Sequence, residues 1–407
     1  MDKQSLLLRN KQSLLLRNKR KIGIIFLIIV AYAISTGASY ALFSRGIVPQ
    51  KKTILQTPPK ITKASGGQVA FDESLPKTEP CPLTGVLYSK EQRQWWEKHR
   101  PLGVMIENHQ EARPQSGLSD ADVIYEAVAE GGITRFLAIF YCLDAGQIGP
   151  VRSARTYFLD FTSEYGDYPL YAHVGGANTS GPADALSQIN DYGWSGYNDL
   201  NQFSIGFPTF WRDYDRLGRT VATEHTMYST TSKLWDFAKS RGLTNVDKDE
   251  NLWNESFVPY TFKDDTPASE RPAIQTVHLE FWKDYSQYFV DWIYDKAGNL
   301  YKRNNEKLAY TDKNNQKTIT ARNVAVLFMQ ESNAYDGYEN NIHLLYKTKG
   351  TGQALVFMDG KEIKATWRKD KRTARTLIFD SNGLPIKFNR GTIWFEILPT
   401  TGVAKTQ

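Results

Sequence analysis

The chain has 407 residues and a formal net charge of +6, which taken alone would favour an acidic partner such as nucleic acid. Residues 2–21, however, hold seven basic residues and one acidic residue, so the remaining 43 basic and 43 acidic residues balance. Residues 22–407 also lack a basic stripe interleaved with aromatic residues, which is the footprint of a nucleic-acid-binding surface. The charge pattern therefore excludes nucleic acid as the expected partner of residues 22–407.

An uncharged apolar run, Ile22 to Phe43, follows the basic N-terminus. A helix needs roughly 20 apolar residues to cross the hydrocarbon core of a membrane, so we predict a transmembrane helix at 22–43. Because the flank richer in Lys and Arg stays inside, residues 1–21 are expected to form a cytoplasmic tail, with the bulk outside the cytoplasm. The alternative is a cleaved signal peptide with its cleavage site among the small residues 35–39, although such apolar segments are usually shorter. Both alternatives predict export, and the first predicts a single-pass protein of the cytoplasmic membrane.

Residues 44–80 are rich in Pro, Lys, Ser and Gly and show no clear hydrophobic period. This composition is typical of a flexible linker. We therefore expect the globular part of the chain to begin at residue 81.

Residues 81–245 alternate between strand and helix patterns. Short apolar runs predict strands at 102–106, 122–126, 134–141 and 169–174. Helices are expected from Ser153 to Gly166, after Ser180 as a capping residue, and from Thr231 to Arg241. This alternation predicts an N-terminal mixed α/β layer domain.

Residues 275–400 have a different pattern, and the charged residues 246–274 are expected to form an inter-domain segment. Apolar residues alternate with polar ones at 277–281 and 288–294, and Asp-Gly and Asn-Gly turn sequences separate short strands further on. This predicts a mainly antiparallel β domain with a core that includes Trp292, Trp367 and Trp394. The predicted fold class is therefore α+β, with a mixed α/β layer domain and a β-rich domain after one transmembrane helix.

The chain has two cysteines, Cys81 and Cys142, which could form a disulfide in an oxidising compartment. The alternative is two unpaired thiols, with Cys142 buried after an apolar strand. The six histidines lack the His-Glu-x-x-His spacing of a zinc site, and the sequence contains no phosphate-binding loop, dinucleotide fingerprint or Gly-x-Ser-x-Gly motif. We therefore predict no metal, no cofactor and no recognisable catalytic motif.

Polar residues are concentrated in the first half, several of them at expected strand ends or in loops. Arg152 and Arg155 stand before an expected helix and could bind a carboxylate or phosphate through planar N–H donors. The alternative is structural, with both arginines paired to Glu126 and Glu130. On the binding hypothesis, the candidate ligand-binding residues are Asn108, Arg113, Gln115, Ser116, Glu126, Glu130, Arg135, Arg152, Ser153, Arg155 and His173.

Two further hypotheses use these residues differently or not at all. Glu126 or Glu130 could act with His173 as acid and base in a hydrolase or transferase for cell-envelope polymers. For His173 the alternative is a hydrogen-bonded structural role. The other hypothesis is a scaffold in which an exposed aromatic groove of the β half docks a protein partner.

A long set of motifs resembles one known family. In chain order these are Pro82-Leu83-Thr84-Gly85, Arg100 to Asn108, Ala112 to Leu118, Glu130 to Ala138, Gly149 to Arg155 and Glu224-His225-Thr226, with residues 350–398 for the second domain. They are similar to the YerB-like lipoproteins, the family of domain of unknown function 3048. The resemblance implies a two-domain exported protein tethered to the cytoplasmic membrane of a bacterium, and it implies no reaction. The chain departs from the lipoproteins because it has no cysteine for lipid modification directly after its apolar run.

These observations together predict a membrane-tethered extracytoplasmic envelope protein that does not catalyse a reaction. Its expected partner is an anionic or peptide-like envelope ligand or another protein.

Overall fold

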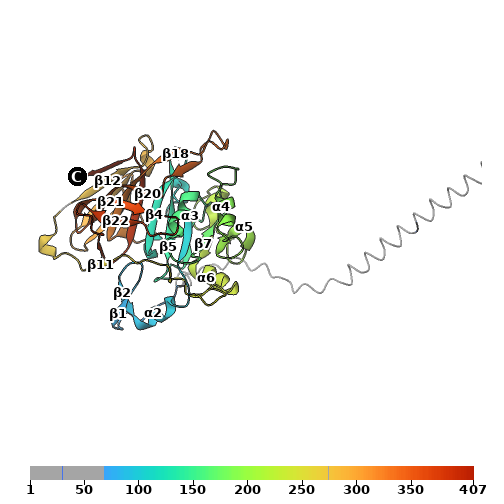
Figure 1. The fold of residues 1–407 in the computed structure, drawn as a ribbon, viewed down its shortest axis with the longest axis horizontal. Helices are drawn as coiled ribbons and strands as arrows, with labels where there is room; N and C mark the ends of the chain where they lie inside the picture. Colours follow the sequence, from blue (N-terminus) through green and yellow to red (C-terminus); the bar gives the residue numbers. More distant parts are fainter. Residues whose placement is uncertain (1–29, 31–67, 274) are drawn as a thin grey trace, which may run out of the picture. The chain divides into compact units, whose positions relative to one another are not determined.

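The structure is a computed structural model that describes Val30, residues 68–273 and residues 275–407, and the latter two ranges belong to one compact unit. The predicted tail (1–21), the predicted transmembrane helix (22–43, Val30 apart) and most of the predicted linker lie outside the described residues. Among the described residues, no helix is long and apolar enough to cross a membrane. The described part is mostly β structure with few helices (Figure 1).

The largest sheet has ten strands in the order β22-β21-β20-β17-β24-β4-β5-β3-β7-β8. Most of its central strands are buried along their whole length, which is typical of strands covered on both faces. The pairs β17–β24, β24–β4, β3–β7 and β7–β8 are parallel, and the other pairs are antiparallel. In sheet order the strands are Leu377–Asp380, Lys361–Lys369, Gly350–Met358, Asn323–Met329, Ile393–Pro399, Val123–Glu130, Ile133–Phe140, Leu102–Glu107, Leu170–His173 and Asp199–Asn201.

This sheet joins the first half of the globular part to the second half. Strand β24 of the second half pairs in parallel with β4 of the first half, with Glu396 opposite Glu126. The two halves therefore share one sheet, although the second half is rich in antiparallel strands as expected. Local patterns could not reveal this pairing, because its partners lie far apart in the sequence.

A second sheet has six strands from the second half and the C-terminus. Its order is β15-β14-β13-β12-β25, and β16 also pairs with β14. Buried residues alternate with more exposed ones along β12 and β13, so one face of this sheet packs inward. In sheet order the strands are Leu308–Ala309, Leu300–Asn305, Val290–Asp295, Thr276–Glu280 and Val403–Thr406, and β16 is Thr320–Ala321.

Four small sheets complete the strands of the described part. They are β1 (Lys77–Pro80) with β2 (Leu87–Ser89), β6 (Gln147–Ile148) and β9 (Trp211–Arg212) on either side of β10 (Met227–Thr230), β11 (Phe262–Lys263) with β23 (Phe388–Asn389), and β18 (Glu331–Asn333) with β19 (Leu344–Tyr346).

From residue 68 onward, the α-helices that the structure describes are short and belong to the first half: α2 (Lys90–Trp96), α3 (Thr156–Thr162), α4 (Ala185–Asp191), α5 (Gln202–Ile205) and α6 (Thr231–Ser240). In Figure 1 helices α3 to α6 lie toward the β7 end of the large sheet, away from β21 and β22. The helix expected after Ser180 begins at Ala185, because Asp184 and not Ser180 caps it, accepting a hydrogen bond from Ser187 N–H at 2.9 Å.

The core contains the tryptophans of the β half. Trp292 and Trp394 are fully buried, and Trp367 is 2% exposed. Trp292 and Trp394 pack edge to face with their ring centroids 5.2 Å apart. These rings therefore stabilise the interior, as expected, and do not line an exposed groove.

Candidate functional site

Three parallel strands, β3, β7 and β8, end at the same edge of the ten-stranded sheet. Their last residues are Glu107, His173 and Asn201. In open sheets, ligands usually bind beyond the carboxyl ends of parallel strands, where loops supply the side chains. This edge of the sheet therefore has the geometry of a binding edge.

The loop that precedes α3 lies between the ends of β3 and β7. The N–H of Arg152 donates to the carbonyl of Met105 at 2.9 Å, and the N–H of Val174 donates to the carbonyl of Arg152 at 3.0 Å. The N–H of Ala154 donates to the carbonyl of Gly175, also at 2.9 Å. Backbone hydrogen bonds to two strand ends therefore fix the position of Arg152.

A cleft of about 420 Å³ lies where these loops meet. Its charged and polar lining consists of Arg152, Ser153, Asn178, Arg212 and Glu224, so positive charge exceeds negative charge there. Its apolar lining consists of Val174, Leu186, Phe203 and Met227. We call this space the Arg152 cleft.

Glu107 forms a salt bridge with Arg152. Its Oε1 lies 3.1 Å from Arg152 Nε, and its Oε2 lies 2.9 Å from His225 Nδ1. The hydrogen bond to Glu107 raises the pKa of His225, against the effect of burial. The Glu107 side chain is nearly buried, whereas the Arg152 side chain keeps 25% of its surface exposed. Arg152 is thus anchored on one side and open to solvent on the other.

Glu130, Arg135 and Arg155 form a closed ion cluster. Glu130 Oε1 lies 2.8 Å from Arg135, and Glu130 Oε2 lies 2.7 Å from Arg155. Although burial opposes it, the charges of both arginines lower the pKa of Glu130 to about 2. Both guanidinium groups are buried, so they are matched to a protein carboxylate and not presented to a ligand. This is the structural role that the sequence left open for Arg155.

Glu126 belongs to a different cluster, which is fully buried between the two large sheets. Arg303 of β14 lies 3.0 Å from Glu126 Oε2 and 3.2 Å from Glu396 Oε1, and all three side chains have no exposed surface. The rings of Phe136, Trp292, Tyr310 and Trp394 surround the guanidinium group, with centroids 4.9–5.6 Å away. Burial, and then the neighbouring Glu126, raise the pKa of Glu396 well above its usual range. We call Glu126, Arg303 and Glu396 the sealed cluster.

Asn108, Gln115 and Arg113 connect the first half to Tyr310 of the second half. Tyr310 OH lies 2.6 Å from both Asn108 Oδ1 and Gln115 Oε1. Arg113 donates to Asn108 Oδ1 at 3.1 Å and to the carbonyl of Gln287 at 3.0 Å. Arg113 and Tyr310 also line a separate cleft of about 320 Å³. These residues therefore join the two halves and do not reach the Arg152 cleft.

His173 and Ser116 have partners within the protein. His173 is fully buried, with Nε2 2.6 Å from Asp199 Oδ1 and Nδ1 2.6 Å from the carbonyl of Gly175. Ser116 accepts hydrogen bonds from the Arg216 guanidinium group at 3.0 and 3.2 Å. His173 thus has the hydrogen-bonded environment that the sequence offered as its structural alternative.

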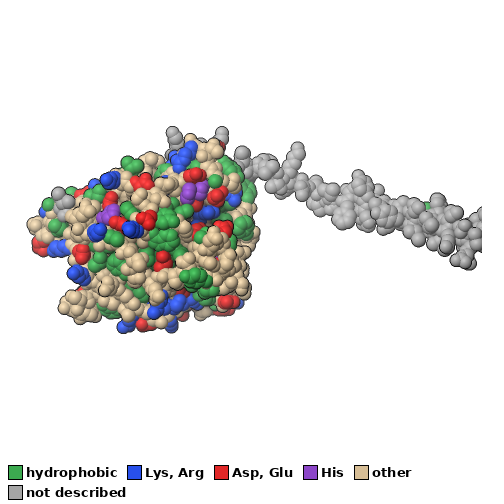
Figure 2. Space-filling view, turned by 90° about the horizontal axis from the view of Figure 1, so that it is seen from above, with side chains coloured by type: hydrophobic (Ala, Val, Ile, Leu, Met, Phe, Trp, Pro, Cys, Tyr) green, Lys and Arg blue, Asp and Glu red, His purple; other side chains and the backbone are tan. Residues whose placement is uncertain are grey.

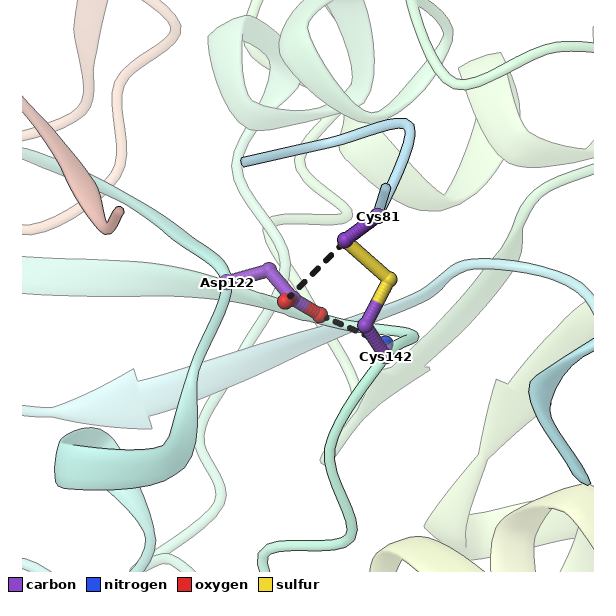
Figure 3. A group of neighbouring side chains, drawn as sticks. All are labelled: Cys81, Asp122 and Cys142. Carbon is purple, nitrogen blue, oxygen red and sulfur yellow. Dashed lines mark hydrogen bonds between the residues drawn. A yellow bond between two sulfur atoms is a disulfide. The ribbon is translucent and has the colours of Figure 1, made fainter. Parts of the chain in front are cut away.

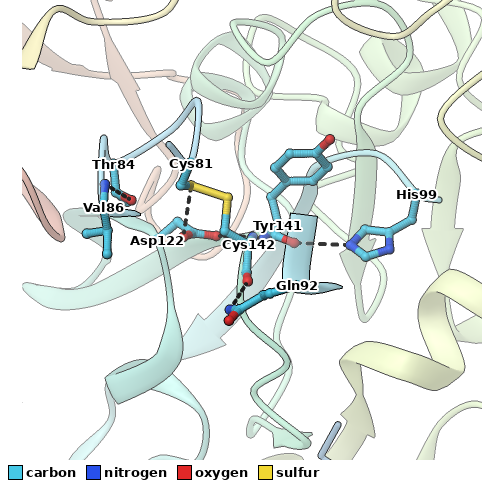
Figure 4. The surroundings of a disulfide bond; sticks show 8 residues. All are labelled: Cys81, Thr84, Val86, Gln92, His99, Asp122, Tyr141 and Cys142. Carbon is cyan, nitrogen blue, oxygen red and sulfur yellow. Dashed lines mark hydrogen bonds between the residues drawn. A yellow bond between two sulfur atoms is a disulfide. The ribbon is translucent and has the colours of Figure 1, made fainter. Parts of the chain in front are cut away.

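A disulfide joins Cys81 and Cys142, which are both buried. Figure 3 shows Asp122 beside it, and burial raises the pKa of Asp122 to about 7 against hydrogen bonds from the N–H groups of Cys142 and Tyr141. Within the described residues, these three side chains are the one group whose atoms could together hold a metal ion, but the disulfide uses both sulfur atoms. Figure 4 shows that Gln92 also donates to the carbonyl of Cys142, at 3.0 Å. The disulfide therefore fastens the start of the globular part to the end of β5.

The structure thus divides the predicted site residues. Arg152 and Ser153 line the Arg152 cleft, whereas Glu126, Glu130 and His173 line neither this cleft nor the cleft at Arg113. The carboxylates and the histidine of the acid–base hypothesis therefore do not meet in either of these two clefts. Three further lining residues carry no recognisable sequence motif: Phe203 of α5, Arg212 of β9 and Asn178, which lies in a loop.

The surface supports the charge balance seen in the sequence. On the face drawn in Figure 2, basic and acidic side chains are interspersed and do not form a broad patch of one sign. This face therefore does not form a broad electropositive surface for a polyanion.

Comparison with known proteins assigns the fold. Residues 83–244 match the N-terminal domain, and residues 277–395 match the C-terminal domain, of a protein family of unknown function, DUF3048. YerB of Bacillus subtilis (strain 168), which is described as a lipoprotein by its name alone, is 28% identical over 328 residues, covering 80% of this chain and 87% of YerB. A crystal structure of B. subtilis YerB superposes with a TM-score of 0.64 at 24% identity, over 81% of this chain and all of that chain, and shows the same fold. The chain belongs to the YerB-like family of two-domain proteins of unknown function.

Proposed function

We propose that this chain is a membrane-tethered extracytoplasmic protein that binds an anionic or peptide-like envelope ligand in the Arg152 cleft without catalysing a reaction. The observation that carries the proposal is the state of Arg152. It is partly exposed at a net positive cleft beyond the carboxyl ends of parallel strands, whereas Arg135 and Arg155 are buried against Glu130. A planar guanidinium group in such a cleft suits a carboxylate or phosphate.

Two observations support an extracytoplasmic location. The relative YerB is named as a lipoprotein, the described part contains a disulfide, and disulfides persist mainly in oxidising compartments. Both cysteines of this chain are used in that disulfide, so we propose residues 22–43 as the anchor in place of a lipid. Protease added to intact spheroplasts should digest residues 68–407. Protection in intact spheroplasts, with digestion only after lysis, would refute the proposed orientation.

The binding proposal is tested with the full-length chain in a detergent that has no sugar headgroup. Cell-wall fragments, teichoic-acid-like polymers and peptides are titrated into the wild-type protein and the Arg152→Gln variant, with binding measured by calorimetry. We expect Arg152→Gln to weaken binding of the anionic ligand at least tenfold, because a charged hydrogen bond contributes about 1.5–3 kcal/mol.

Arg322→Gln is the matched control. The Arg322 side chain is 31% exposed and lies 3.2 Å from Asp265, so it resembles Arg152 in exposure and pairing but lies in the second half. The control should bind like the wild type. Equal affinities of the wild type and Arg152→Gln for every ligand that binds would refute the Arg152 cleft as the site.

A further inference from the structure

The Arg152 cleft has an exposed aromatic wall whose position is fixed by the backbone. Phe203 is 76% exposed although it is a large apolar side chain, and it belongs to α5, directly after β8. Asn201 at the end of β8 accepts hydrogen bonds from the N–H groups of Gly175 (3.1 Å) and Phe203 (3.2 Å). The Asn201 side-chain oxygen therefore holds the backbone of Phe203 close to the backbone of Gly175, which lines the cleft.

Gly175 allows the ring to stand close to the cleft floor. Its φ is +56°, a conformation that favours glycine. A Cβ atom at this position would lie 2.9 Å from Cε2 of Phe203, which is too close for any other residue without a shift. Part of the Phe203 ring thus packs over Gly175, and the rest remains open beside Arg152 and Glu224.

This combination selects a class of ligand. An exposed ring offers a flat apolar face, and the C–H-rich face of a sugar ring can stack on it. The cleft adds planar side chains that bind pairs of hydroxyl or amide groups, namely Arg212, Asn178 and Glu224, while Arg152 offers its charge to an acidic group. Two more exposed rings lie close by in the sequence. Phe207 (53% exposed) lies between α5 and β9, and Tyr214 (57% exposed) follows β9.

We infer that the Arg152 cleft binds an acidic glycan, with a sugar ring stacked on Phe203 and its carboxylate or phosphate held by Arg152. This inference rests on the proposed function, because it names the ligand class for the same cleft. Binding of an acidic peptide would use the charge of Arg152, but it would not explain the exposed, flat ring of Phe203.

Four probes separate the ring from the charge. A disaccharide of N-acetylglucosamine and N-acetylmuramic acid carries sugar rings and a carboxylate, and chitobiose carries similar rings without a charge. Oligo(glycerol phosphate) carries charge without a ring, and an acidic peptide carries carboxylates without a sugar. Each is titrated into the full-length wild type and into Phe203→Ala, Phe203→Tyr and Arg152→Gln, in a detergent without a sugar headgroup.

We expect the acidic disaccharide to bind more tightly than the other three probes. Phe203→Ala should weaken its binding about tenfold, as expected for the loss of one aromatic stacking contact, and Phe203→Tyr should keep wild-type affinity. Leu384→Ala is the control for loss of an exposed apolar side chain, because Leu384 is 62% exposed and follows β22 at the opposite end of the ten-stranded sheet. This control should not change binding.

The outcomes distinguish the inference from the proposed function. If the phosphate polymer or the peptide binds through Arg152 while the acidic disaccharide does not, or if Phe203→Ala leaves disaccharide affinity within twofold, the glycan inference is overturned and the proposed function stands. If no probe depends on Arg152, both are overturned. Circular dichroism of each variant checks that the fold is unchanged.

Discussion

The sealed cluster and the Arg152 cleft are built from the same residue types, and they differ in exposure. In both, an arginine contacts a glutamate on a strand of the ten-stranded sheet. Arg303 has no exposed surface and faces two carboxyl groups, whereas Arg152 is 25% exposed and its near neighbour Glu107 is shared with His225. Residue type alone therefore does not distinguish an arginine that joins two sheets from one that can meet a ligand.

The comparison also separates two kinds of energetic consequence. Replacing an arginine that lies between buried carboxyl groups strongly destabilises the fold, because a buried carboxylate would remain without a counter-charge. A partly exposed arginine contributes little to stability, because water replaces its contacts. The following predictions test this difference, beginning with the largest effect.

Arg303→Met should destabilise the protein most, by about 3–5 kcal/mol, because Glu126 would lose its positive partner in a fully buried site. The measurement is the midpoint of urea unfolding followed by tryptophan fluorescence. Arg322→Met, at the surface of the second half, serves as the control and should change the midpoint little. A small effect of Arg303→Met would show that the cluster is not sealed.

Glu130→Gln should cost on the order of 2 kcal/mol at pH 7, which is less than Arg303→Met because the Glu130 side chain is 20% exposed. The pKa of Glu130 is lowered to about 2, so its ionised form stabilises the fold above the usual carboxyl pKa. This contribution should disappear as the pH falls from about 4.5 toward 2, and the difference between wild type and variant should shrink with it. Unfolding midpoints measured between pH 7 and pH 2 test the window, and a difference that grows on acidification would contradict it.

Glu396→Gln should be close to neutral at low pH and stabilising at high pH. The pKa of Glu396 is raised in the folded state, first by burial and then by Glu126, so folding favours its protonated form. Stability linked to this group is fully present below the pKa of the unfolded chain and is lost as the pH rises toward the folded value. In thermal unfolding, the stability of the variant should therefore increase relative to the wild type as the pH rises above about 5. A constant difference across this range would count against a protonated Glu396.

Arg152→Gln should have the smallest effect on stability, below about 1 kcal/mol, because its side chain is partly exposed and its salt bridge is screened. The same urea experiment measures it beside Arg303→Met. A loss as large as that of Arg303→Met would mean that Arg152 is a structural residue. The comparison between the sealed cluster and the cleft would then fail.

The sequence predicted local elements better than their assembly. Apolar runs at 102–106 and 134–141 correspond to β3 and β5, because buried strands carry their signal within a few residues. The pairing of β24 with β4 and the contact of Arg303 with Glu126 join distant residues, and neither local pattern nor spacing encodes them. The same limit applies to the site, where the segment before α3 was recognisable by its arginines. The ring of Phe203 became part of the site only through the fold.

Arginine-selective labelling with phenylglyoxal, read out by mass spectrometry with and without a bound acidic envelope polymer, tests the central claim most directly. We predict that Arg152 reacts in the free protein and is protected when the polymer binds, while Arg303 stays unmodified in both samples because it has no exposed surface. Equal labelling of Arg152 with and without bound polymer would contradict the assignment of the Arg152 cleft as the ligand site.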